Sequence, residues 1–144
     1  MGMSNGKYYW EVTITTYSPS GTLVGITAST EQWTGVASYI GSTTSSYGYY
    51  NGGTKYNNAA SASYGASWTT GDVIGVTYDT STGTLTFYKN NVSQGTAYSG
   101  LTGTFMPGVS AYNNGTPLLD VNFGQQPFQF TPPSGYVALN AYNI

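Results

Sequence analysis

The side chains that most often carry out enzyme chemistry are scarce in this sequence of 144 residues. The chain contains no His and no Cys, so a histidine-based catalytic triad and a cysteine nucleophile are both excluded. Acid–base chemistry would depend on carboxylates, and glycoside hydrolysis in particular needs two of them facing each other across one cleft. The five carboxylates are Glu11, Glu31, Asp72, Asp79 and Asp120.

The spacing of these carboxylates does not suggest such a pair. Asp72 and Asp79 stand at the two ends of one predicted strand, and Asp72 is placed as a cap for backbone amides. Asp120 alternates outward beside Leu119, and Glu31 lies in a polar loop. We therefore predict that the protein is not an enzyme. Because metal ligands do not cluster in the sequence, we also expect no metal site and no cofactor.

Positive charge is equally sparse. There is no Arg, the three lysines are scattered, and the net charge is −2. Nucleic acids and anionic membrane surfaces are bound through clustered Lys and Arg, so we expect neither partner. No apolar run approaches the ~20 residues of a membrane-spanning helix, so we expect no membrane insertion. The first residues lack the apolar core of a signal peptide, and the ordered pattern starts almost at once, as in a domain cut from a longer protein.

The remaining residues must build the elements that position any site, and they predict strands. The 15 Tyr, 5 Phe and 3 Trp supply a core, and the length suits one domain over residues 1–144. In Lys7–Thr16 the apolar residues alternate with polar ones, which is typical of a half-buried strand. Further strands are expected at Thr22–Ala28, Val73–Asp79, Thr84–Lys89, 104–111 and 118–123, with a short one through Val92.

Two tight turns fit this pattern. Residues 80–83 end in a Gly that supplies a positive φ, and Asn90-Asn91 tolerates the left-handed conformation. Between residues 29 and 67 the chain is rich in Ser, Gly, Asn and Tyr, which predicts long loops and short strands. Regularly spaced short strands indicate a sandwich or barrel, and the long middle region is where such folds keep a functional surface.

The order of several sequence blocks resembles the SPRY domain family over nearly the whole chain. The blocks are residues 6–12 (GKYYWEV), 24–26 (VGI), 47–49 (YGY), 71–76 (GDVIGV), 83–90 (GTLTFYKN), 105–110 (FMPGVS), 121–124 (VNFG) and 130–136 (FTPPSGY). One departure is Asn91, which stands where the family usually has Gly. The resemblance implies an all-β fold, a bent sandwich of two antiparallel sheets with concanavalin-like jelly-roll architecture. It also implies a non-catalytic interaction module.

In family members that bind short peptides, loops at one rim form the pocket, and the resemblance carries this rim to three places. They are the loop Ser29, Thr30, Glu31, Gln32 and Trp33, then Tyr39, and the loop Tyr112, Asn113 and Asn114. Tyr and Trp offer large contact areas, while Ser and Asn adapt their hydrogen bonds. The family's upstream pocket loop and its charged pocket groups have no counterpart here, so the peptide preference is not carried over.

Structural roles are open for the same residues. Trp33 is as well explained by packing on the core edge as by binding, and Tyr39 and Tyr112 fit strand positions. The segment from Asn113 to Gly115 is first of all a turn, whereas Tyr47, Tyr49 and Trp68 match core positions of the family.

Three functions remain. The composition, rich in Gly, Ser, Thr, Asn and Tyr with little charge, favours a receptor-binding or adhesion module on a virion or extracellular surface, for example a phage tail fibre, with a glycan or protein ligand. The alternatives are an intracellular protein–protein adaptor and a structural decoration domain of a larger assembly. The oligomeric state does not follow from the sequence.

Overall fold

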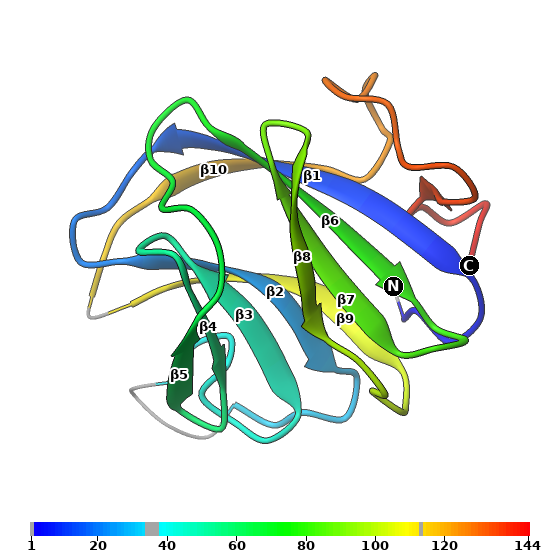
Figure 1. The fold of residues 1–144 in the computed structure, drawn as a ribbon, viewed down its shortest axis with the longest axis horizontal. Coiled ribbons are helices and arrows are strands. Elements are labelled where there is room, and N and C mark those ends of the chain that lie inside the picture. Colours follow the sequence, from blue (N-terminus) through cyan, green and yellow to red (C-terminus); the bar gives the residue numbers. More distant parts are fainter. Residues whose placement is uncertain (1, 34–37, 113) are drawn as a thin grey trace.

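The chain consists of β-strands joined by turns and loops (Figure 1). The computed structural model describes residues 2–33, 38–112 and 114–144. Within them, no helix is long and apolar enough to cross a membrane. The strands are β1 (Lys7–Thr16), β2 (Thr22–Ala28), β3 (Ser46–Tyr50), β4 (Thr54–Asn57), β5 (Ala60–Ser63), β6 (Val73–Asp79), β7 (Thr84–Lys89), β8 (Val92–Tyr98), β9 (Phe105–Ala111), β10 (Leu118–Asn122) and β11 (Val137–Ala138).

These strands form two sheets that pack face to face. The first sheet has the order β10-β1-β6-β7-β8, and the two-residue β11 runs parallel to β1 beside it. The second sheet has the order β5-β4-β3-β2-β9, and its strand pairs are antiparallel. The predicted all-β sandwich of two antiparallel sheets is confirmed.

The strand bounds follow the alternation in the sequence closely. β1, β2, β6 and β7 have the predicted bounds, β9 begins one residue later than predicted, and β10 ends one residue earlier. The polar stretch between residues 29 and 67 contains the short strands β3, β4 and β5. Both predicted turns are present, because Gly83 has a φ of 61° and the two asparagines at 90 and 91 have φ values of 48° and 69°.

The core lies between the two sheets. From β1 the side chains of Tyr8, Trp10, Val12 and Ile14 all point into it and are fully buried. The family-matched aromatic residues divide, since Tyr49 and Trp68 are buried while Tyr47 and Phe123 are half-buried at its margin. A second group of buried side chains comes from β2, β6 and β7, namely Val24, Ile26, Ile74, Val76, Leu85 and Phe87.

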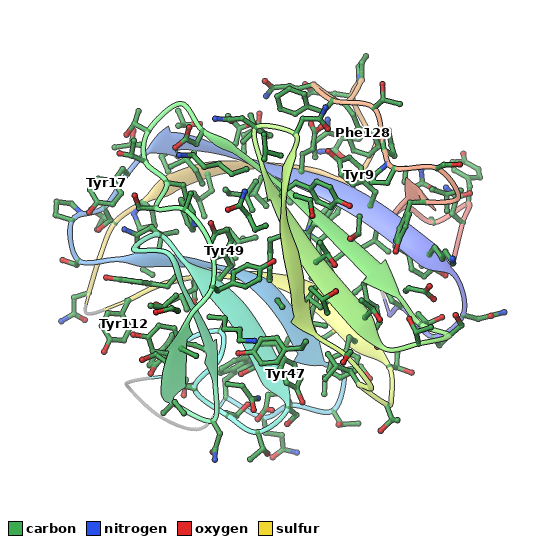
Figure 2. All side chains as sticks on the ribbon, viewed as in Figure 1. Tyr9, Tyr17, Tyr47, Tyr49, Tyr112 and Phe128 are labelled. Carbon is green, nitrogen blue, oxygen red and sulfur yellow. The ribbon has the colours of Figure 1, made fainter. Side chains whose placement is uncertain are left out.

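Strand β1 is buried on its other face as well, where Tyr9 and Glu11 are only 3% and 1% exposed. The segment after β10 covers them, and the Phe128 ring lies edge-on to Tyr9 at 5.0 Å between centroids (Figure 2). The Glu11 carboxylate accepts hydrogen bonds from the backbone N–H groups of Gln129 and Phe130 and from the Tyr9 hydroxyl, each at 2.9 Å. We call residues 123–139 the C-terminal strap.

Candidate functional site

Three glycines form a row across the outer face of the second sheet. Gly25 on β2 pairs with Gly48 on β3 and with Gly108 on β9. A Cβ at Gly48 would lie 2.8 Å from the Ile40 carbonyl oxygen, and one at Gly108 would lie 2.5 Å from Ile40 Cδ1. Because glycine has no side chain, the loop containing Ile40 can lie directly on the sheet along this row.

Two serine hydroxyls from the sheet fix that loop. The Ile40 N–H donates a hydrogen bond to Ser110 Oγ on β9, and the Gly41 N–H donates one to Ser46 Oγ on β3, both at 2.9 Å. Ser46 is fully buried, so its bond forms away from water, where it is stronger. The loop is thereby positioned from both flanks of the glycine row.

Glu31 ties a second loop to the same face. Its carboxylate accepts hydrogen bonds from the hydroxyls of Ser45 and Thr43. These bonds favour the charged form and lower the pKa of Glu31 below its ordinary value. Glu31 therefore acts as a support for the loop that follows β2.

A hollow of about 230 Å³ opens between these loops and β9. Thr27 contributes to its lining although the residue is only 6% exposed, and its Oγ1 has no hydrogen-bond partner among the described residues. The side chain of Trp33, which is 42% exposed, lines the same hollow together with Tyr39 and Pro107. Buried polar atoms are normally hydrogen-bonded, but the Thr27 Oγ1 lies beneath the surface of the hollow, so the side chains that a ligand can reach there are those of Trp33 and Tyr39.

Four tyrosines stand next to the hollow in a closed cycle of edge-to-face contacts. Tyr39 lies 4.8 Å from Tyr112 and 5.9 Å from Tyr56, and Tyr50 lies 5.8 Å from Tyr56 and 6.0 Å from Tyr112, measured between ring centroids. All four side chains are half-buried. We call them the tyrosine quartet. Because Tyr39 belongs to both features, the hollow and the quartet form one continuous surface.

Of the site residues predicted from the sequence, the structure brings together Trp33, Tyr39 and Tyr112. The first two line the hollow, and the third contacts Tyr39 within the quartet. Asn114 is exposed just beyond, with a φ of 59° in the predicted turn. Asn113 lies outside the described residues.

The other predicted residues are placed differently. Ser29, Thr30 and Gln32 are exposed and do not line the hollow formed by the described residues. The Ser29 N–H donates to the Thr104 carbonyl at 2.9 Å, which anchors the start of the loop. The binding role of all these residues stays a prediction.

Sequence reasoning missed Tyr50, Tyr56 and Thr27. A signal for Tyr50 was present in the sequence, because Tyr49 alternates inward to the core and Tyr50 must then point outward. The glycine row was a second signal, but it appears only when the register of three strands is known.

The carboxylates do not converge on this surface. Asp72 caps the Thr69 N–H at 2.8 Å, as predicted, and lies 3.7 Å from Lys89 Nζ, while Asp79 lies 3.3 Å from Lys7 Nζ. In residues 2–33, 38–112 and 114–144 there is no group of three or more His, Cys, Asp or Glu side chains that could hold a metal ion. The site offers rings, hydroxyls and backbone groups, which is an inventory suited to binding.

Comparison with known proteins places these features in a family. A model of the SPRY domain matches residues 7–126. Ran-binding protein 10 of Danio rerio is 34% identical over 87% of this chain, and the Ran-binding proteins 9/10 homolog of Drosophila melanogaster is 35% identical over 88%. Human Ran-binding protein 9 is 34% identical over 87% of the chain. The matched segments are 20%, 13% and 17% of these relatives, so the chain spans a fifth of their length or less.

A solved structure shows the same fold. The SPRY domain of human HERC1 superimposes with a TM-score of 0.73 and covers 88% of this chain and 80% of its own, at 22% sequence identity.

Proposed function

Because this chain belongs to the SPRY domain family, a family of protein-interaction modules, we propose that it binds an extended segment of a partner protein on the outer face of its second sheet. The observation that carries the proposal is a hollow of about 230 Å³ beside β9, lined by the half-buried Tyr39 and by Trp33, which is 42% exposed. SPRY domains are non-catalytic binding modules, so the proposed role involves binding alone.

The relatives favour the adaptor among the functions expected from the sequence. The matched Ran-binding proteins come from animals, which fits a protein–protein adaptor better than a phage tail fibre. Their names describe binding to Ran, and that property belongs to proteins at least about five times longer than the matched segment. Binding to Ran is therefore not proposed for this chain. The virion or extracellular location stays a prediction, as does the single domain over residues 1–144.

The size of the hollow supports a peptide ligand of modest affinity. Sites for drug-sized molecules and cofactors usually enclose roughly 300–1,000 Å³, whereas this one has about 230 Å³. That space suits one or two side chains of a partner. Small interfaces of this kind form transient complexes, and we expect a Kd on the order of 10 μM.

The proposal is tested by selecting peptides from a displayed random library and measuring each synthetic peptide by fluorescence polarisation. Trp33→Ala is expected to weaken binding about tenfold or more, because aromatic anchors dominate small interfaces. Thr102→Val, at an exposed residue lining a separate hollow, is the control and should change nothing.

Two outcomes contradict this proposal. One is a library that yields no peptide binder. The other is a set of peptides that bind wild type and Trp33→Ala equally well.

A further inference from the structure

The tyrosines of this protein differ in what their hydroxyls do. Those of Tyr47, Tyr49 and Tyr64 donate to backbone carbonyls, Thr44, Ala66 and Gly95 respectively. By contrast, no described residue is a hydrogen-bond partner of any hydroxyl in the tyrosine quartet. A half-buried hydroxyl without a protein partner is available to a ligand. Among the described residues, the four hydroxyls of the quartet therefore make no hydrogen bond and can donate to a ligand.

Strand alternation keeps charge away from the quartet. Tyr56 and Lys55 are neighbours on β4, and while the first points outward, the Lys55 ammonium reaches the Ala97 carbonyl at 2.7 Å and the Tyr98 ring at 4.8 Å on the other side. The nearby carboxylate of Glu31 is held by two hydroxyls. No charged group of the described residues faces the four rings, so a charged ligand would lose its hydration without gaining a counterion.

The close packing of the rings also excludes a cation cage. Neighbouring centroids are 4.8 to 6.0 Å apart with interplanar angles of 71° to 85°, so at each contact the edge of one ring lies against one face of the next. A cage needs a gap between open ring faces, and usually negative charge beside it. What remains is a neutral aromatic surface studded with hydroxyl donors.

We propose that this surface selects an uncharged, proline-containing segment in the polyproline II conformation, an inference that rests on the proposed function and names its ligand class. Polyproline II has no internal hydrogen bonds, so its carbonyls are free to accept from hydroxyls. Proline rings pack on aromatic faces, and the stiff chain loses little entropy on binding.

The test is isothermal titration of three synthetic peptides with blocked ends. The first is an uncharged oligoproline with interspersed leucines, the second has every proline replaced by alanine, and the third carries two glutamates. We expect the first to bind about tenfold more tightly than either of the others. The double variant Tyr50→Phe/Tyr56→Phe keeps the rings and removes two hydroxyls, so it should bind the first peptide about 5- to 30-fold more weakly.

Tyr88→Phe is the matched control. Tyr88 is a half-buried tyrosine on β7 of the first sheet, and its hydroxyl also has no partner among the described residues. Its removal should leave the affinity unchanged. A phenylalanine fills nearly the same volume as a tyrosine, and thermal melting of each variant checks that the fold is retained.

The outcomes separate this inference from the proposed function. Equal binding of the proline and alanine peptides, or no effect of the double variant, overturns the polyproline ligand. If library-selected peptides without proline still bind and lose affinity in Trp33→Ala, the proposed function stands and only the ligand class is wrong. Selective binding of a neutral glycan on an array, lost in the double variant while all peptides fail, overturns both.

Discussion

The two outer faces of the sandwich differ in how completely they are covered. On the first sheet the C-terminal strap covers β1. Two backbone N–H groups of the strap and the Tyr9 hydroxyl donate hydrogen bonds to the buried Glu11 carboxylate. On the second sheet a loop also lies on the strands, but beside it the exposed Trp33 and the half-buried Tyr39 line an open hollow. Figure 2 shows Phe128 of the strap and Tyr112 of the tyrosine quartet at opposite sides of the molecule.

This difference indicates which face is built for stability and which for binding. A buried carboxylate is tolerable only when its lone pairs are satisfied by donors, and the strap supplies two backbone N–H groups to Glu11. Aromatic side chains left exposed beside a hollow, such as that of Trp33, add little to stability and can serve as contacts for a partner. We therefore expect substitutions on the first face to act on folding, and those on the second to act mainly on binding.

The largest expected effect is that of Glu11→Ala. It leaves the N–H groups of Gln129 and Phe130 and the Tyr9 hydroxyl without their acceptor, and each unpaired group costs about 1–3 kcal/mol. We expect the free energy of unfolding to fall by about 4 kcal/mol in urea denaturation. Asp120→Ala, an exposed carboxylate on neighbouring β10, should cost less than about 0.5 kcal/mol. Equal losses in both variants would mean that Glu11 does not hold the strap.

An intermediate effect is expected from Gly108→Ala in the glycine row. The new Cβ would lie 2.5 Å from Ile40 Cδ1, the end of a flexible side chain, so we expect a loss of about 1–2 kcal/mol. Ile40 stands between Tyr39 and Gly41 in the fixed loop, so displacing it also moves Tyr39 at the hollow. We therefore expect the free energy of peptide binding to fall by more than the free energy of unfolding. Both are measured on one sample, by urea denaturation and fluorescence polarisation.

The double variant Gly108→Ala/Ile40→Val is the control for this mechanism. Valine lacks Cδ1, the atom that would be contacted, so it should restore most of the lost affinity. If Ile40→Val gives no recovery, the loop is not held by its fit to the glycine row.

The sequence predicts the strands and turns of this fold better than it predicts the segments that cover its two outer faces. Alternation in β1 and the turn residues Gly83, Asn90 and Asn91 are local signals, and each was sufficient to place its element. The burial of Glu11 depends on backbone groups more than a hundred residues away. No local pattern predicts that contact.

The candidate site divides in the same way. Trp33, Tyr39 and Tyr112 were predicted as site residues from the resemblance, and the structure brings them together. Tyr50 and Tyr56 join them only through strand register, because Tyr56 on β4 pairs with Gly48 on β3, which lies two residues from Tyr50 and on the same face of the sheet. The family pattern thus predicts the rim, and the register of the second sheet adds Tyr50 and Tyr56 to the candidate surface.

The smallest expected effect concerns the support that Glu31 gives to the binding face. Hydrogen bonds from Ser45 and Thr43 lower its pKa in the folded protein, so the charged form persists below the ordinary value near 4.5. The support is therefore fully present above about pH 5 and is lost as the pH falls through the lowered pKa. We expect the affinity for an uncharged peptide to be constant from pH 5 to pH 8 and to fall below about pH 4.

Glu31→Gln should weaken binding by no more than about threefold, because an amide oxygen still accepts hydrogen bonds, and it should remove this acid dependence. The pKa values of Asp72 and Asp79 are also lowered, but both carboxylates remain in the variant, so their effect cancels in the comparison. An acid dependence that is the same in wild type and Glu31→Gln would show that the loop of the second face is held by other contacts.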